Sequence, residues 1–317
     1  MILSVTTLEG TDGTSSAARF RSQVHVAYAL PGHATLDCSF RRQWCRPSYQ
    51  GSHMSKALIA AAILVAISPV ALAQKSVTAD PLLTHRGWEV GGQLSEYRYE
   101  EPNIGAKIWG PRVGVIGAYT YASASHWFFK IDGRNAFGSL KYEGSGTQDS
   151  VPDWILETRA VLGKDFLPRR GVSLSPFAGL GYRYLYNDLR GATSTGAIGY
   201  QRYSQYFYAP LGLTSRFHVN GKWVIAPTIE YDYFIKGRQK TQFTDIGQGY
   251  IDANNKQDKG YGYRLSVMAE HGPWAFGPWM HYWNIEDSDI VPIGFGVRGF
   301  EPKNETREVG LEVKYRF

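Results

Sequence analysis

The chain has 317 residues, with 34 Lys and Arg against 28 Asp and Glu, which gives a formal net charge of +6. One long apolar run lies at residues 57–73, so a bundle of membrane-spanning helices, which needs several runs of about 20 apolar residues, is excluded. Aromatic residues make up 14% of the chain and glycines number 35. So many aromatic side chains argue against disorder and favour β-structure.

The first predicted element is a secretory signal peptide at residues 54–73. Lys56 supplies a positive charge, residues 57–70 form an apolar stretch, and Ala71-Leu72-Ala73 has the A-x-A pattern of a cleavage site. The alternative is a short buried helix. We expect cleavage after Ala73 and export of the rest of the chain.

Residues 1–53 precede this signal, although a signal peptide normally begins a chain. We therefore predict that Met54 is the true initiator and that residues 1–53 are an unstructured, mis-assigned start. Both cysteines, Cys38 and Cys45, lie there, so disulfides and thiolate metal sites are not expected in the exported chain. The exported residues 74–317 hold 28 basic and 25 acidic residues, a net charge of about +3, which is too small to indicate nucleic-acid binding.

Residues 74–86 are expected to form a periplasmic N-terminal segment, and residues 87–317 alternate between apolar and polar side chains with the period of two that is typical of strands. In one segment, one face has Trp154, Leu156, Thr158, Ala160 and Leu162, and the other has Glu157 and Arg159. The alternation predicts ten strands, at about 87–101, 106–121, 127–143, 153–166, 172–187, 200–218, 222–239, 260–271, 274–286 and 304–317. Most are far longer than the average soluble strand of about 5–6 residues.

The connections between these segments alternate between short and long, as in outer-membrane barrels, which have short periplasmic turns and long outer loops. Short connections are expected near 122–125, 167–171, 219–222 and 271–273, and long ones near 144–153, 188–197, 240–259 and 286–304, with a shorter outer one at 101–105. An even strand number places both ends of the barrel chain on the periplasmic side. The sequence therefore predicts an all-β fold, a ten-stranded antiparallel transmembrane β-barrel.

Aromatic side chains gather at both ends of the predicted strands. Because amphipathic rings prefer the two interfaces of a bilayer, two girdles are expected, and scattered core aromatics are the alternative. The girdle at the short turns comprises Trp88, Trp127, Phe166, Phe217, Trp223, Trp274 and Phe317. The girdle toward the long loops comprises Tyr97, Tyr99, Tyr182, Tyr184, Tyr231, Tyr233, Tyr261 and Tyr263.

The faces expected to point into the barrel have charges of both signs. They are Glu89, Arg112, Lys130, Asp132, Arg134, Glu157, Arg159, Arg183, Arg216, Glu230, Asp232, Arg264, Glu270 and Glu312. At about eight strands, side chains just fill a barrel, so we expect these charges to pair and to close most of a ten-stranded lumen. A narrow channel for small solutes is the alternative, and a wide diffusion pore is not expected.

The ten strands and tall outer loops resemble the omptins, a family of outer-membrane proteases. The resemblance extends over most of residues 87–317 in architecture, and locally it rests on Ala197-Ile198-Gly199-Tyr200-Gln201-Arg202 and Ala209-Pro210-Leu211-Gly212-Leu213-Thr214. It implies a catalytic Asp pair that faces an Asp–His pair across the barrel mouth and activates a water. The corresponding loops here offer Asp149 and Asp245 alone, without a histidine, so no catalytic residue is assigned.

Five histidines follow the signal peptide. His85 precedes the barrel, His126, His218 and His271 lie at expected short turns, and His281 lies in the ninth strand. A Ser–His esterase of the outer membrane would need a lipid-facing histidine near the outer leaflet, and only His281, beside Trp279 and Trp283, is a candidate. An interfacial or lumenal structural role for His281 is the alternative that we favour.

Charged side chains in two outer regions are further candidates for binding. Glu286-Asp287-Ser288-Asp289 could hold Ca²⁺ through oxygen ligands, but the spacing of a known calcium loop is missing, so a solvated loop is favoured and no metal or cofactor is assigned. Lys236, Arg238 and Lys240 could meet the phosphates of lipopolysaccharide or could face the lumen. The sequence leaves both directions open.

The final residues Lys314-Tyr315-Arg316-Phe317 resemble the signature by which bacterial outer-membrane proteins are recognised for insertion. We therefore expect a monomeric bacterial outer-membrane protein whose partners are membrane lipid, lipopolysaccharide and the barrel assembly machinery. We expect it to be non-enzymatic and to act through its outer loops in surface interaction or envelope integrity. The alternatives are a narrow channel and an omptin-like or lipid hydrolase with unrecognised catalytic residues.

Overall fold

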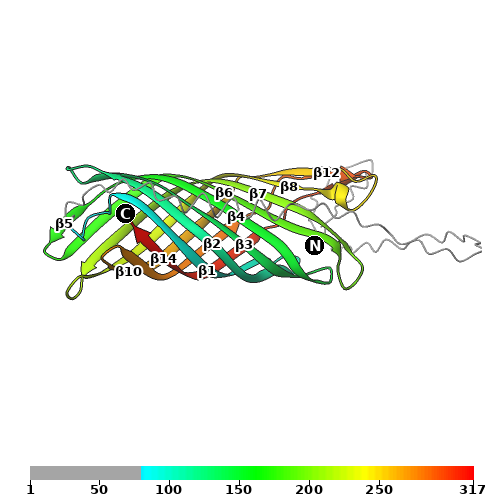
Figure 1. Cartoon of the computed structure of the whole chain (residues 1–317). Coiled ribbons are helices and arrows are strands. Elements are labelled where there is room, and N and C mark those ends of the chain that lie inside the picture. The colour runs from blue at the N-terminus through cyan, green and yellow to red at the C-terminus, as the bar shows by residue number, and fades with distance from the viewer. Residues whose placement is uncertain (1–79) are drawn as a thin grey trace, which may run out of the picture. The chain divides into compact units, whose positions relative to one another are not determined.

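The computed structural model describes residues 80–317, so the expected signal peptide and the residues before it lie outside the described part of the chain. Ten long antiparallel strands of this part form a closed barrel (Figure 1). They are β1 (Gly87–Glu101), β2 (Ala106–Ala122), β3 (Trp127–Glu143), β4 (Thr147–Lys164), β6 (Val172–Ala192), β7 (Ile198–His218), β8 (Trp223–Thr241), β10 (Gly260–His271), β11 (Trp274–Ile285) and β14 (Asn304–Arg316). The connections contain the short strands β5 (Phe166–Arg169), β9 (Ala253–Gln257), β12 (Val291–Gly294) and β13 (Val297–Gly299), and a 3₁₀ turn, η2 (Phe243–Asp245).

The barrel closes between its first and last strands. β1 pairs with β2 on one side and with β14 on the other, in a register that runs from Glu89 opposite Arg316 to Glu100 opposite Glu305. At a second junction, β8 pairs directly with β10, and β9 continues the sheet along residues 237–241 of β8. Because each of the ten strands has a neighbour on both sides, backbone N–H and C=O groups bond within the barrel, which is the condition for a strand to cross hydrocarbon. The predicted fold is confirmed.

The barrel exterior is apolar around its middle. Leu94, Leu180, Leu211 and Leu311, which lie on four different strands, are 63–65% exposed. Leu156 and Leu162, from the apolar face of the alternating segment, also face outward, while Glu157 between them is 2% exposed. Soluble proteins rarely expose a contiguous apolar surface of this extent, whereas hydrocarbon favours it.

Two ends of the barrel differ in their connections. The end with β5 and the turns at residues 123–126, 219–222 and 272–273 is here called the short-turn end, and the end with residues 242–259 and 286–303 is called the long-loop end (Figure 1). No helix among residues 80–317 is long and apolar enough to cross a bilayer.

The girdle at the short-turn end is confirmed, because all seven of its aromatic residues are exposed on the outside. At the long-loop end, Tyr231, Tyr233 and Tyr263 are exposed outward, but Tyr97 and Tyr99 were wrongly assigned to the girdle. Both are buried inside the barrel. In β1 the outward residues have even numbers, such as Trp88 and Leu94. The predicted position of the two tyrosines along the strand is therefore right, but the predicted face is wrong.

Two of the four expected long loops are short. β3 and β4 continue until only residues 144–146 connect them, and only residues 193–197 connect β6 to β7. These strand ends extend beyond the apolar band, where no lipid imposes alternation, and a register shift between Leu140 and Tyr142 interrupts the pattern further. Residues 242–259 and 286–303 are long connections as expected, and each contains short regular elements.

Candidate functional site

Charged side chains from several strands form a buried network in the middle of the lumen. Arg264 donates to Asp232 Oδ2 at 2.6 Å and ion-pairs with Glu157. Arg134 donates to Glu157 at 2.8 Å and to Glu308 at 2.9 Å. These residues come from β10, β8, β4, β3 and β14, so the network ties strands around the whole barrel. The expected pairing of interior charges is confirmed for this network, but not for Arg183, whose buried guanidinium makes no hydrogen bond to the described residues and lies 5.3 Å from the ring centre of Trp283.

The network continues toward the long-loop end through Arg112, which was expected in the interior, and through Asp153 and Asn187, which were not. Asp153 on β4 accepts a hydrogen bond from Arg112 at 2.5 Å and another from Asn187 at 2.6 Å. Both side chains of the Arg112–Asp153 ion pair are 0% exposed. The sequence predicts a strand that begins at Asp153, next to a loop, and the extension of β4 to Thr147 is what places Asp153 inside.

Apolar side chains fill the lumen between this network and the long-loop end. Trp283 and Tyr208 meet edge to face with ring centroids 5.0 Å apart, and Tyr206 meets Phe234 in the same way at 5.5 Å. The Arg112 guanidinium stacks over the ring of Tyr97 at 3.3 Å. The buried cluster comprises Tyr97, Tyr99, Ala106, Ile108, Ala136, Leu140, Tyr142, Val151, Ile155, Leu185, Leu189, Tyr206, Tyr208, Phe234, Trp283 and Ile285. We call it the lumenal core.

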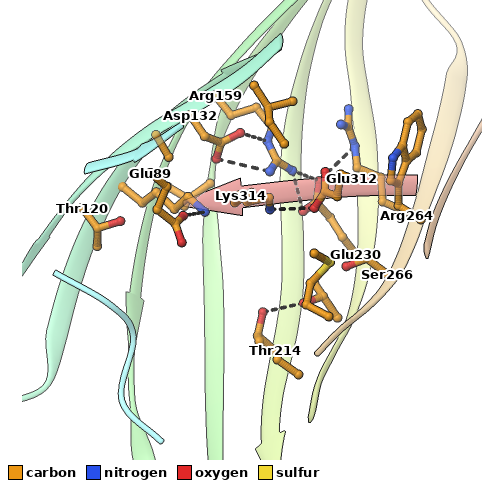
Figure 2. A pocket seen from close by; sticks show the side chains of 18 of the residues that line it. Glu89, Thr120, Asp132, Arg159, Thr214, Glu230, Arg264, Ser266, Glu312 and Lys314 are labelled. Carbon is orange, nitrogen blue, oxygen red and sulfur yellow. Dashed lines mark hydrogen bonds and ion pairs between the residues drawn. The ribbon is translucent and has the colours of Figure 1, made fainter. Parts of the chain in front are cut away.

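A cavity of about 220 Å³ lies in the lumen on the other side of the network, toward the short-turn end (Figure 2). Charged side chains line it in pairs: Arg159 with Asp132 at 2.8 Å and Glu230 at 2.6 Å, Lys314 with Glu312 at 2.6 Å, and Lys130 with Glu89 at 3.4 Å. Because each of these charges already has a partner, the wall of the cavity offers no unpaired charge of either sign at these positions. Such a wall suits water better than a charged ligand.

The segment before β1 crosses the short-turn end of the lumen. Asp165, which is 3% exposed, accepts hydrogen bonds from the Thr84 backbone N–H at 2.8 Å, the Thr84 hydroxyl at 2.7 Å and the Ser175 hydroxyl at 2.6 Å. The Ser173 hydroxyl donates to the carbonyl of buried Leu82 at 2.5 Å. Residues 80–86 therefore form a floor beneath the cavity, and we call them the floor segment.

His85 belongs to this floor and lines the cavity. Burial of its ring lowers the pKa of His85 below its usual value, although nearby Glu89 acts in the opposite direction. The expected N-terminal segment thus has a defined place for its described residues, 80–86. Its partner Asp165 could not be recognised from the sequence, because an isolated Asp at a turn is ordinary.

The two aspartates considered for catalysis occupy unrelated places. Asp149 is exposed on β4, and Asp245 lies in η2, where its carboxylate accepts a hydrogen bond from the Gln201 backbone N–H at 3.0 Å. His281 is inside the lumen, with its ring 4.6 Å from that of Trp279. A lipid-facing histidine for an esterase is therefore wrong, because the alternation of β11 turns His281 inward with Trp279 and Trp283.

The acidic run at residues 286–289 is engaged within the loops. Asp289 Oδ1 accepts from the Lys256 backbone N–H at 2.6 Å, Asp287 Oδ1 accepts from the Lys303 backbone N–H at 2.5 Å, and Glu286 pairs with the Lys303 ammonium at 2.9 Å. This hydrogen bond to Glu286 raises the pKa of Lys303 above its usual value. Among residues 80–317, no group of His, Cys, Asp and Glu side chains is arranged to hold a metal ion.

The two long connections pack together into a platform at the long-loop end. Tyr200, Phe243, Ala253 and Ile293 form its buried core, with the rings of Tyr200 and Phe243 4.8 Å apart. Residues 286–303 are held to the barrel by Glu301, which ion-pairs with Arg202 of β7 next to Tyr99 and Glu101. We call residues 242–259 and 286–303 together the rim platform.

The three cations that could face either way point outward. Lys236 and Arg238 are exposed and Lys240 is half-buried, whereas Gln239 and Thr241 between and beyond them are buried inside. The competing lumenal orientation is wrong for all three. The cause is a one-residue irregularity of β8, which is described below.

No family model matches the chain, and no curated protein matches it in sequence. Among solved structures, the chain is similar in fold to the outer membrane protease OmpT from Escherichia coli, with 12% identity over 73% of this chain and 96% of that chain and a TM-score of 0.47. Similar barrels include Neisserial surface protein A (13% identity, 73% and 97% covered, TM-score 0.30) and the toluene transporter TodX of Pseudomonas putida (10% identity, 74% and 90% covered, TM-score 0.27). These likenesses concern the fold alone.

Proposed function

We propose that the chain is a closed, non-conducting barrel of the bacterial outer membrane that acts through its rim platform, in surface interaction or envelope integrity. The observation that carries this proposal is the lumenal core. Its large side chains, among them Trp283 at 1% and Tyr208 at 0% exposure, fill the space through which a solute would have to pass.

The alternative of a narrow channel requires a hydrated path through the barrel. Such a path would have to cross the lumenal core and the ion network below it. Opening the network would separate buried charges from their partners, which is energetically costly. The cavity near the short-turn end covers only part of the path, and the floor segment lies across its other side. Closure at two levels supports a structural or adhesive role over transport.

The rim platform offers an ordered surface for contact. Ile251, Ile290 and Phe295 are 49%, 52% and 69% exposed there. Phe295 and Gly296 connect β12 to β13 with φ values of 51° and 73°, the pair of positive angles that a two-residue hairpin turn needs. A bulky residue rarely adopts a positive φ, so this turn presents its aromatic ring at a conformational cost.

We also propose that the chain is non-enzymatic. Water activation at a barrel mouth requires a base and a group that stabilises the developing charge, held together. Asp149 is exposed by itself, and Asp245 is occupied by a backbone hydrogen bond. For the outer-membrane location, the support is the apolar exterior with aromatic residues at both of its borders.

Planar-bilayer recording of the refolded chain tests the proposal. We expect no stable conductance from the unaltered chain, and intermittent conductance from a Tyr208→Ala/Trp283→Ala variant in which the lumenal core is hollowed. Heat-modifiable migration on gels shows that both proteins are folded and inserted. A steady, ion-selective conductance of the unaltered chain would favour the narrow channel instead.

A further inference from the structure

A bulge in β8 turns three cations from the lumen to the outside. Tyr208 lies opposite Phe234 in the β7–β8 pairing, but Phe207 lies opposite Lys236, so Ile235 is an additional residue on β8. Before the bulge, even-numbered residues such as Asp232 and Phe234 are buried in the lumen, and after it odd-numbered residues such as Gln239 are. Bulges commonly redirect side chains in this way. Without the additional residue, Lys236, Arg238 and Lys240 would point into the lumen.

A fourth cation completes an outward row. Lys256 on β9 lies opposite Arg238 in the β8–β9 pairing and is exposed. We call Lys236, Arg238, Lys240 and Lys256 the cation ladder. It rises along the outer wall of β8 and β9, just above the exposed apolar residues Ile229 and Tyr233 of the same strand.

Aromatic rings fix the level of the cation ladder relative to a membrane. The Lys236 ammonium lies 5.3 Å from the ring centre of Phe207, and the Lys240 ammonium lies 6.0 Å from that of Tyr203. Phe207 is exposed on the outside, and its ring centre lies 4.9 Å from that of Tyr182, which belongs to the aromatic girdle of the long-loop end. Because such girdles lie at the headgroup level of a bilayer, the ammonium groups beside them lie at the level of lipid phosphates.

The cation ladder places four positive charges at neighbouring positions of β8 and β9. Within the described chain, its one ion pair joins Lys240 to Asp252 at 3.8 Å. Some other outward cations at this end are neutralised on their own strands, as Arg98 is by Glu100 at 2.5 Å and Arg307 is by Glu305 at 3.2 Å. The ladder is therefore a surface on which an anion at headgroup level is electrostatically favoured.

We propose that the cation ladder binds the phosphate groups of an anionic outer-leaflet lipid of the lipopolysaccharide type, whose acyl chains lie along the apolar wall below. Ammonium and guanidinium groups form short, charge-assisted hydrogen bonds with phosphate oxygens. The bound lipid would fix the barrel at one side of its wall, next to the rim platform. This inference rests on the proposed outer-membrane location but not on the absence of conductance, so a conducting barrel would leave it intact.

Lipid binding by the refolded full chain in detergent tests the proposal, with native mass spectrometry and thermal unfolding as readouts. The probes are a diphosphorylated glucosamine-based lipid, the same lipid without phosphates, and inorganic phosphate. We expect the diphosphorylated lipid to remain bound and to raise the unfolding temperature in a salt-sensitive manner, and the other two probes to have little effect. Equal binding of both lipids would show that acyl chains alone are recognised, and an equal effect of inorganic phosphate would show a free-phosphate site; either result overturns the proposal.

A K236Q/R238Q/K240Q variant tests the residues. Each cation near an anionic surface contributes about fivefold to affinity, so the triple variant should bind the diphosphorylated lipid about 100-fold more weakly. The matched control, R98Q/R307Q, removes two outward cations at the same end that are already paired with glutamates and should bind like the unaltered chain. Unchanged binding by a folded triple variant would overturn the assignment. If the triple variant does not fold, the comparison of the two lipids on the unaltered chain still decides.

Discussion

Arg264 and Glu157 form a buried ion pair in the centre of the barrel although they are 107 positions apart in the sequence. β10 and β4 are not neighbours, so the pair spans the lumen rather than one strand pairing. Arg264 also contacts Asp232 and Glu230 of β8, and Glu157 also accepts from Arg134 and the Tyr208 hydroxyl. The two residues therefore join the ion network to the lumenal core.

Replacement of Arg264 should strongly destabilise the barrel. In Arg264→Ala, three neighbouring carboxylates lose their common partner while they remain buried, and removal of one member of a buried ion pair costs about 3–5 kcal/mol. Urea unfolding in liposomes measures the loss. Arg307→Ala is the control, because this outward arginine is exposed and its ion pair with Glu305 lies at the surface, and should change stability by about 1 kcal/mol or less. Equal effects of the two substitutions would contradict the buried network.

Much of the barrel could be predicted because its exterior has to alternate. Along the apolar band, lipid on one side and paired charges on the other impose a period of two, which made strands such as β1 and β14 recognisable to within a residue or two. The alternation says nothing about partners across the lumen, such as Arg264 and Glu157, because those depend on the register of distant strands. The alternation also weakens where the strands leave the apolar band, so the sequence predicts loops where β4 and β6 in fact continue.

For a related reason, the sequence alone could not show whether the side chains of the cation ladder face the lumen or the outside. A bulge adds one residue and leaves the alternation intact on both of its sides, so the sequence around Ile235 shows two regular strand patterns without marking the change of face. The inward orientation of Tyr97 and Tyr99 could have been predicted from the sequence. Trp88 and Leu94 show that even-numbered residues of β1 face outward, so odd-numbered residues face the lumen. Both residues lie near a strand end, where a girdle is expected, but their odd numbers place them on the inner face.

A charged substitution on the apolar exterior should lower the stability of the folded barrel by about as much as it does in other membrane barrels. Leu180 is 65% exposed in the middle of β6, so Leu180→Arg places a cation against hydrocarbon, which costs about 2–4 kcal/mol. Leu180→Ile, which keeps the apolar surface, should change stability by less than about 1 kcal/mol. Unfolding in liposomes distinguishes the two. If Leu180→Arg were as stable as Leu180→Ile, the proposed membrane-facing surface would be wrong.

Loss of Asp165 should release the floor segment without unfolding the barrel. In Asp165→Ala the Thr84 and Ser175 groups lose an ionised acceptor, and a hydrogen bond to a charged group contributes about 1.5–3 kcal/mol. Hydrogen exchange of residues 80–86 should become faster by at least about tenfold, while exchange in the strands stays unchanged. Asp80→Ala, which removes only a local bond to the Leu82 N–H, is the control and should leave exchange at Thr84 nearly unchanged. Unchanged protection in Asp165→Ala would mean that Leu82, through its burial and its hydrogen bond from Ser173, holds the segment without Asp165.

We expect no peptide cleavage at the long-loop end, either by intact cells or by the refolded chain. Peptides with basic residues are the substrates to test, because the family that the sequence resembles consists of proteases. A test with such peptides gives peptide cleavage the best chance of being detected. Asp149→Ala should change neither cleavage nor stability, since its carboxylate is exposed, whereas Asp245→Ala should loosen η2 through loss of its bond to the Gln201 N–H, a loss of about 1–3 kcal/mol locally. Limited proteolysis of residues 242–259 reports that loosening independently of activity.

Cleavage by the unaltered chain that disappears in Asp149→Ala, whose fold is unaffected, would overturn the non-enzymatic proposal. Cleavage that persists in both variants would place the activity on other residues or on a contaminating protease, which a preparation from cells that lack the chain would distinguish.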